Sequence, residues 1–221
     1  MSDKSPPSVS RSMPQGFEVY LASSAREAAN LARNHAERFG KEDRRRLITA
    51  FHKAESLAEF ALEDAIEQVR ETYREDLVRQ RAEEEKHVRV FASYLGETNE
   101  VPRPKGRKRP ESVWFTLLLL NELTGYCQFA FLFPLLRNEE QELLAEVMGE
   151  EEEHVERLLG WMEPVWGERG GPQSVKMVER FREDLPGRME QFFEGEELDS
   201  LRKGMEGIVG SLLNQLLSSF R

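Results

Sequence analysis

The chain has 221 residues, of which 39% are hydrophobic, so it is long enough for one packed domain with extensions. Its 31 basic and 41 acidic residues give a formal net charge of −10, which disfavours nonspecific binding to nucleic acid. The single cysteine, Cys127, excludes an intrachain disulfide framework and a four-cysteine iron centre, and this usage is typical of a cytoplasmic protein.

The N-terminal part of the chain predicts a tail followed by an accessory helix. Residues 1–16 are rich in Ser and Pro and contain no apolar stretch of the kind found in a secretory signal, so we expect a disordered tail and no export. Residues 17–40 are expected to contain a helix that is capped at Ser23 and Ser24 and ended by Gly40.

A helical hairpin is predicted next. Its first helix is expected from residue 42 to about 69, and its second from about 74 to 95, where a glycine ends it. The interval of 29 residues between Glu55 and Glu84 predicts a turn near residues 70–73. Two arms of about 12 residues, each about 18 Å long, would then bring both glutamates to the same level.

Residues 97–111 are predicted to form an exposed crossover to a second hairpin. The stretch from Val101 to Pro110 contains prolines, a glycine and five cations, which oppose regular structure and stand out in an acidic chain. One interpretation is that residues 102–110 dock an acidic partner, a phosphorylated substrate or RNA such as tRNA. The other is a solvated linker, which we favour because charge alone does not define a binding site.

The second hairpin begins with a very apolar helix, predicted from residue 113 to about 133. The apolar stretch 113–136 is long enough to cross a membrane. Asn121, Glu122 and Gln128 lie in its middle, however, and a carboxylate is costly to bury in lipid. We therefore predict no membrane span, and expect the N-terminal helix, the C-terminal extension or a homodimer partner to cover this helix.

A fourth helix is predicted after a turn at Pro134 and Arg137-Asn138. It is expected to run to about Trp161, before Pro164 ends it. The accessory helix and the four helices of residues 41–165 would then be followed by a helical extension at 172–221.

The C-terminal extension ends in an apolar stripe at helical spacing. Its members are Met205, Ile208, Val209, Leu212, Leu213, Leu216, Leu217 and Phe220. We interpret this stripe as a face that covers the bundle or forms a dimer interface. A lipid-facing helix is less favoured because the cations beside the stripe are few.

A pattern of metal-ligand type occurs twice along these helices. A glutamate is followed after 29 residues by Glu-x-x-His, and the second occurrence is offset from the first by 67 residues. The residues are Glu55, Glu84 and His87, then Glu122, Glu151 and His154. Because residues i and i+3 lie on one helix face, a Glu and a His at that spacing can hold the same metal ion. The pattern predicts a dinuclear metal site.

Helical periodicity supports this choice of ligands. Glu55 shares its face with apolar residues, whereas Glu59 shares its face with polar ones. Glu84 also aligns with an apolar face, so the neighbouring Glu83 and Glu85 are expected to point aside.

This constellation resembles the ferritin-like di-iron carboxylate superfamily, in which two helices give one Glu each and two give Glu-x-x-His. The resemblance covers about residues 42–163. It implies an all-α fold with a ferritin-like antiparallel four-helix bundle, extended here by N- and C-terminal helices. It also implies that Glu84 and Glu151 bridge two metal ions, with Glu55 and Glu122 as terminal ligands. His87 and His154 would bind one ion each.

The mixture of carboxylate and imidazole ligands suits iron or manganese better than zinc or magnesium. We therefore expect two iron ions, with manganese as the alternative. Tyr126, one turn after Glu122, could hydrogen-bond a ligand carboxylate or carry an electron, or it could be an ordinary buried tyrosine. Glu59 has the equivalent place in the first half and could lie beside the ligands.

Three classes of function follow from these observations. The first is an enzyme that uses O2 to oxidise an organic substrate, as the resemblance to the tRNA isopentenyladenosine hydroxylases and the aldehyde-deformylating oxygenases implies. The chain contains no nucleotide or flavin motif, so a ferredoxin or reductase would supply its electrons. The second is a ferroxidase or peroxide-reducing protein of the ferritin or rubrerythrin kind. The third is a helical scaffold without metal.

Overall fold

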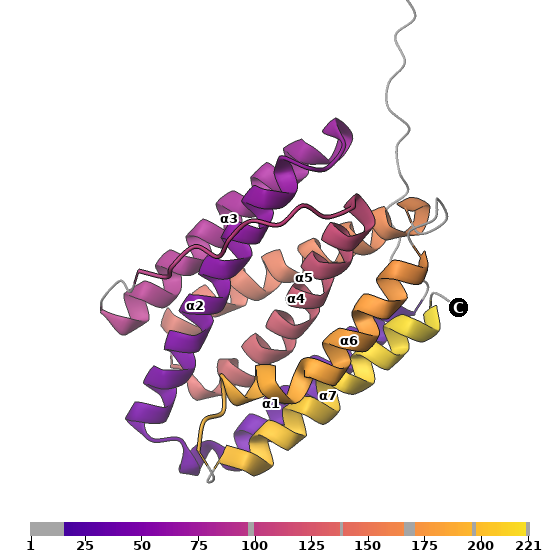
Figure 1. Ribbon diagram of the computed structural model, residues 1–221. Helices are drawn as coiled ribbons and strands as arrows, with labels where there is room; N and C mark the ends of the chain where they lie inside the picture. Colours follow the sequence, from indigo (N-terminus) through magenta and orange to yellow (C-terminus); the bar gives the residue numbers. More distant parts are fainter. Residues whose placement is uncertain (1–15, 97–99, 138, 166–170, 196–197, 220–221) are drawn as a thin grey trace, which may run out of the picture.

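The protein is all-helical, as predicted. The computed structural model describes residues 16–96, 100–137, 139–165, 171–195 and 198–219 (Figure 1). Every regular element in these ranges is a helix. The elements are α1 (Phe17–His35), η1 (Ala36–Arg38), α2 (Lys41–Ile66), α3 (Glu71–Leu95), α4 (Glu111–Leu132), η2 (Phe133–Leu135), α5 (Glu139–Val165), α6 (Gly171–Glu190) and α7 (Asp199–Ser219).

Helix α2 packs mainly on α3, and α4 mainly on α5, so the middle of the chain forms two hairpins (Figure 1). Helix α2 begins after Gly40, whose N–H donates a hydrogen bond to Asp43 Oδ2 at 3.0 Å. Helix α3 ends at Gly96, as expected, because this residue has a φ of 70° and its N–H donates to the carbonyl of Ala92. Glycine adopts that left-handed conformation without the penalty that a side chain brings.

The turn between α2 and α3 comes a few residues earlier than predicted, because α3 begins at Glu71. The residue before it, Arg70, is held by Glu111 at the start of α4. The backbone N–H and the Nε of Arg70 donate to the two carboxylate oxygens of Glu111, each at 2.8 Å. A partner 41 residues away along the chain fixes the start of this helix, and local sequence does not reveal it.

Helix α4 lies at the centre of the molecule. It packs on α5, α1, α6 and α7, so the accessory helix and the C-terminal extension both cover it (Figure 1). The segment Glu111–Leu135 has the length and composition of a membrane span, but 78% of its most apolar window is buried inside the protein. This burial is compatible with a soluble protein.

Further helix boundaries differ from the sequence-based prediction. Helix α1 ends at His35 and is followed by η1, so Gly40 does not end it but precedes the first residue of α2. Helix α1 begins at Phe17, six residues before the predicted cap at Ser23. The buried side chains of Phe17 and Leu21 anchor its first turns, so packing replaces a hydroxyl cap. Helix α5 does not end before Pro164 but continues to Val165, because a proline in the last turn removes one hydrogen bond without stopping the helix.

Some predicted features lie outside the described residues. These are the tail before Gly16, Asn138 of the predicted turn and Phe220 of the apolar stripe. The other members of that stripe face the interior, and α7 packs on α1 and α6.

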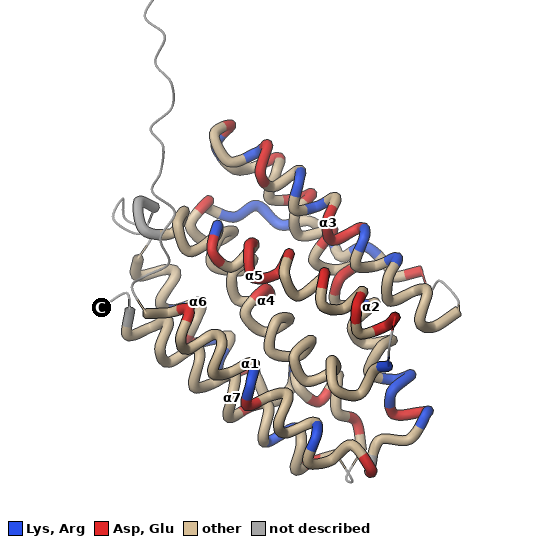
Figure 2. The backbone as a smooth tube through the Cα atoms, turned by 180° about the vertical axis from the view of Figure 1, so that it is seen from behind, with Lys and Arg blue, Asp and Glu red and all other residues tan. Residues whose placement is uncertain are grey.

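The described part of the basic crossover runs along α2 in an extended conformation, and Figure 2 shows its Lys and Arg residues in blue. Arg103 forms ion pairs with Glu63 and Asp64 of α2. The backbone N–H of Arg109 donates to Gln68 Oε1 at 2.9 Å. The segment is thus fastened to the first hairpin, and a role in binding RNA or an acidic partner stays a prediction.

Candidate metal centre

The two hairpins bring the six predicted ligands together in the interior. Glu55 comes from α2, Glu84 and His87 from α3, Glu122 from α4, and Glu151 and His154 from α5, and all six side chains are buried. They form two groups, Glu55–Glu84–His87–Glu151 and Glu84–Glu122–Glu151–His154. Within each group the nearest ligand atoms lie within 4.8 Å of one another. The two groups share Glu84 and Glu151.

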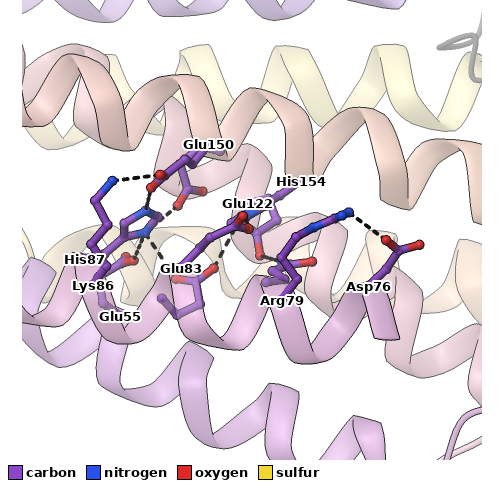
Figure 3. Close-up of polar contacts among 12 residues, drawn as sticks. Glu55, Asp76, Arg79, Glu83, Lys86, His87, Glu122, Glu150 and His154 are labelled. Atoms are coloured by element: carbon purple, nitrogen blue, oxygen red, sulfur yellow. Dashed lines mark hydrogen bonds and ion pairs between the residues drawn. The ribbon is translucent and has the colours of Figure 1, made fainter. Parts of the chain in front are cut away.

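His87 turns one ring nitrogen towards the buried inner carboxylates and the other towards the outer glutamate Glu150 (Figure 3). Its Nδ1 lies 3.2 Å from an oxygen of Glu55, 3.2 Å from one of Glu151 and 3.4 Å from one of Glu84. Its Nε2 contacts Glu150 Oε2 at 2.8 Å. Nδ1 is therefore the nitrogen available to a metal ion, and Nε2–H is the donor to Glu150.

His154 has the matching arrangement in the other half. Its Nδ1 lies 3.3 Å from Glu122 Oε2 and 3.4 Å from Glu84 Oε1. Its Nε2 contacts Glu83 Oε2 at 2.8 Å. Each histidine of one hairpin is thus oriented by a glutamate of the other hairpin.

Sequence reasoning missed the role of Glu83 and Glu150. Glu83 does point aside from its own helix's inner face, as expected, but it points towards the histidine on α5. A signal was nevertheless present, because Glu83 and Glu150 are separated by the same 67-residue offset that relates the ligands. An acidic residue directly before each Glu-x-x-His would have identified the pair.

A nearby cation helps to lower the pKa of each of these outer glutamates. Lys86 Nζ lies 2.7 Å from Glu150 Oε1, and the hydrogen bonds from His87 and Lys86 lower the pKa of Glu150 to about 2. The pKa of Glu83 is lowered chiefly by its hydrogen bond with His154, with help from the charge of Arg157. Both glutamates are therefore anionic at neutral pH, and they stabilise the imidazole N–H groups that face them.

The inner carboxylates behave in the opposite way. Burial and the charge of Glu55 raise the pKa of Glu84 to about 7. Burial, with the charges of Glu122 and Glu84, raises the pKa of Glu151 well above its usual range. Burial alone would lower the pKa of both histidines, but their hydrogen bonds with glutamates outweigh it and raise both values. Without metal, the raised pKa values mean that these buried groups retain protons, which offset the negative charge of the cluster.

The types of donor atom in this cluster are compatible with metal binding. Each group offers three carboxylates and one imidazole, and Glu84 and Glu151 are placed to serve both groups. Glu84 Oε1 is buried without a hydrogen bond, although His154 Nδ1 is 3.4 Å away. An unpaired buried carboxylate oxygen is costly, and a cation between the two groups would satisfy it. The buried Glu and His side chains could therefore hold metal.

The two halves differ at one buried position. Gln80 on α3 donates a hydrogen bond from Nε2 to Glu122 Oε1 at 2.8 Å. The residue that corresponds to Gln80 after the 67-residue offset is Val147, which has no polar group to offer Glu55. The group that contains Glu122 thus has a fixed amide that the group with Glu55 lacks.

A cavity of about 660 Å³ opens onto the four buried glutamates. Its walls come from α2, α4 and α6 and from the chain after α6, and neither histidine is among the lining residues. Two small residues related by the 67-residue offset, Ala58 and Gly125, border it. A Cβ atom added at Gly125 would lie 3.7 Å from Glu151 Oε2. The cavity therefore reaches the four carboxylates without being lined by either histidine.

The two further residues singled out from the sequence lie at the edge of this arrangement. Tyr126 is half-buried, does not line the cavity, and forms no hydrogen bond with another described residue. Burial, followed by the charge of Glu152, raises the pKa of its hydroxyl. Glu59 is also half-buried, and burial, followed by the charge of Glu63, raises its pKa, with a smaller contribution from Glu84.

Comparisons with protein-family models, with curated proteins and with solved structures found no match to this chain. The grounds for a metal site are therefore the positions of the side chains themselves.

Proposed function

We propose that α2 to α5 form a ferritin-like four-helix bundle around a dinuclear iron centre, and that the protein is an oxidoreductase which uses O2 to oxidise an organic substrate. The observation that supports this most directly is that two buried groups of carboxylates and imidazole share Glu84 and Glu151. Shared carboxylates are what a pair of bridged ions requires.

The ligand types favour iron, with manganese as the alternative. Zinc usually takes four ligands in a tetrahedron, and magnesium rarely takes imidazole, whereas each group here offers three carboxylates and one imidazole. A bound pair of ferrous ions would supply the electrons that activate O2.

The buried side chains would hold the metal ions and fix the orientation of the ligands. Glu55 and Glu122 would be terminal ligands, and Glu84 and Glu151 would bridge. Glu83 and Glu150 would orient the histidines across the hairpins, since each accepts a hydrogen bond from Nε2 at 2.8 Å. This leaves Nδ1 of each ring free to bind metal.

The cavity is the reason to favour an organic substrate. Its volume of about 660 Å³ is typical of a small-molecule site, and it opens directly onto the four glutamates. Its apolar wall includes Leu57, Leu117 and Phe192. We also infer that the electrons come from a separate ferredoxin or reductase, because the chain contains no glycine-rich nucleotide fingerprint.

Ferroxidase or peroxide-reducing activity is the second candidate. It is favoured by the acidic residues Glu42, Asp43 and Glu194 on the cavity wall, which would attract ferrous ions. The two functions differ in turnover: an oxygenase keeps its two irons, whereas a ferroxidase oxidises many.

The test is an anaerobic ferrous titration followed by one pulse of O2, with iron per chain and near-ultraviolet absorption recorded. We expect two tightly held irons that cycle only when an electron donor is added. Glu84→Gln should lose at least one of them, because it removes a charge from a ligand shared by both groups. Glu85→Gln is the matched control, since Glu85 is exposed and pairs with Arg89.

Continued oxidation of many irons per chain would identify a ferroxidase instead. If neither the wild-type protein nor Glu84→Gln bound metal, the remaining interpretation would be a helical scaffold that functions without metal.

A further inference from the structure

One arginine on the cavity wall has no hydrogen-bond or ion-pair partner among the described residues. Arg188, near the end of α6, lines the same cavity as the four glutamates. Its Nε is buried without a hydrogen-bond partner, and its guanidinium makes no hydrogen bond or ion pair with any described residue. Asp184, one turn earlier, interacts with it only through longer-range charge. A guanidinium held in this way keeps N–H groups that an anion could pair with.

The orientation of Arg188 is fixed by an aromatic ring. Its Cζ lies 4.1 Å from the centre of the Phe181 ring, and Phe181 is buried and also lines the cavity. Stacking on an aromatic face leaves the edge of the guanidinium, with its N–H groups, free to meet a ligand.

The other cations on the cavity wall differ from Arg188. Arg45 donates to the carbonyl of Leu95 at 3.2 Å. Arg46 lies 3.9 Å from Asp43 and its side chain is 60% exposed, and Lys53 is exposed. Only Arg188, among the described cations that line the cavity, combines partial burial with an unpaired donor.

A second donor faces the same cavity. Gln128 is buried, and the only hydrogen bond of its amide group with a described residue runs from Nε2 to Met189 Sδ at 3.8 Å. A thioether is a weak acceptor, so a ligand oxygen would be a better partner for this amide. Gln128 on α4 and Arg188 on α6 thus both present donors on the wall of one cavity.

We propose that Arg188 anchors the carboxylate of an amphipathic organic acid, and that this acid is the substrate class of the metal centre. The proposal rests on the proposed function. A carboxylate matches the planar fork of a guanidinium, and the apolar body of the acid would lie against Leu57, Leu117 and Phe192. Two bound divalent ions would balance the charges of the four glutamates, so the site would not repel an anion.

The test measures decanoate binding by calorimetry, with anaerobic ferrous-loaded protein. We expect Arg188→Gln to weaken decanoate binding roughly 10- to 100-fold, because one charge-assisted hydrogen-bonding group is lost. Binding of decanol, which has the same chain without the charge, should be unchanged. Arg188→Lys should recover only part of the affinity, because it restores the charge without the fork.

Arg182→Gln is the matched control. It removes the same charge from the same helix, but Arg182 is exposed and donates to Asn214 on α7. Thermal unfolding and iron per chain are measured for every variant, so that a folding defect is separated from a lost contact.

Equal decanoate affinity in Arg188→Gln and Arg182→Gln, with iron retained, would overturn the proposed anchor and leave the metal function intact. Tighter Arg188-dependent binding of decyl phosphate than of decanoate would overturn the assignment to carboxylates. If the wild-type protein bound no iron but bound decanoate through Arg188, the anchor would stand as a binding site and the metal function would fail.

Discussion

The two ring nitrogens of each histidine contact different groups. Nδ1 of each ring faces the inner carboxylates, and Nε2 contacts an outer glutamate at 2.8 Å. An anionic acceptor on Nε2–H fixes the tautomer and makes Nδ1 a better donor to metal. The outer glutamates therefore control how well the rings can bind.

Replacing an outer glutamate tests this control. Glu150→Gln and Glu83→Gln keep the size of the side chain but remove its charge, so we expect each to weaken metal binding by about 10- to 100-fold. Competition with a chelator of known affinity would measure the change. The control Glu85→Gln should bind as the wild type does, and unaltered affinity in both outer variants would show that the histidines need no such support.

Only some of the residues in this cluster could be recognised from the sequence. The ligand set could be predicted because all its members obey one spacing and one offset. The same offset relates Glu83 to Glu150, but which histidine each of them contacts, and the contact of Gln80 with Glu122, are set by how the two hairpins pack and not by any spacing within the sequence. Arg188 was not singled out either, since an unpaired donor is recognised only when its surroundings are known.

At the scale of helices, small residues leave room beside the cluster. Gly125 lies on α4, three residues after Glu122, on the side that faces the cavity. Its counterpart on α2 is Ala58. The absence of larger side chains at these two positions allows the cavity to reach the carboxylates.

Gly125→Ala should be tolerated and slightly stabilising. The added Cβ would lie no closer than 3.7 Å to Glu151 Oε2, an ordinary contact, and alanine favours a helix over glycine by about 0.5–1 kcal/mol. Urea unfolding would measure the gain, and iron per chain should stay the same. A large loss of stability or of metal would mean that Glu151 lies closer to this helix than described.

Local sequence signals predicted some helix ends correctly and others wrongly. The end of α3 at Gly96 depends on the conformation of that glycine alone. The start of α3 depends on Glu111, and the start of α1 on the burial of Phe17, so both involve tertiary contacts. The predicted end at Pro164 was wrong because one missing hydrogen bond near a helix end is a small loss.

The stability of the metal-free protein as a whole depends on protons bound to its buried glutamates and histidines. The pKa of Glu84 is raised to about 7, and those of Glu151, His87 and His154 are also raised. The folded protein therefore binds more protons than the unfolded chain at pH values between the ordinary pKa of these groups and their raised values.

We accordingly expect the metal-free protein to become less stable as pH rises from about 5.5 to 8. The stability that Glu84 contributes is fully present below its ordinary pKa of 4.5 and is lost as pH rises through about 7, a change on the order of 3 kcal/mol. Glu150, whose pKa is lowered to about 2, acts with the opposite sign only at more acidic pH.

Thermal unfolding of chelator-treated protein across this pH range would check the slope. Glu84→Gln should flatten it, because the amide does not titrate. Added metal displaces protons, so the stabilisation that it gives should grow as pH rises. A melting temperature of metal-free protein that increases from pH 5.5 to 8 would contradict this account.

The exchange of glutamates across the hairpins has a consequence for symmetry. Each ligand group takes members from both hairpins, so a separate hairpin could complete the site only with a second copy, related by a twofold axis. In such a pair every substitution would appear twice. One continuous chain removes that constraint, and Gln80 with Val147 shows the result. The two proposed metal positions are therefore free to differ in affinity, and in that case a limiting supply of metal would fill them in order.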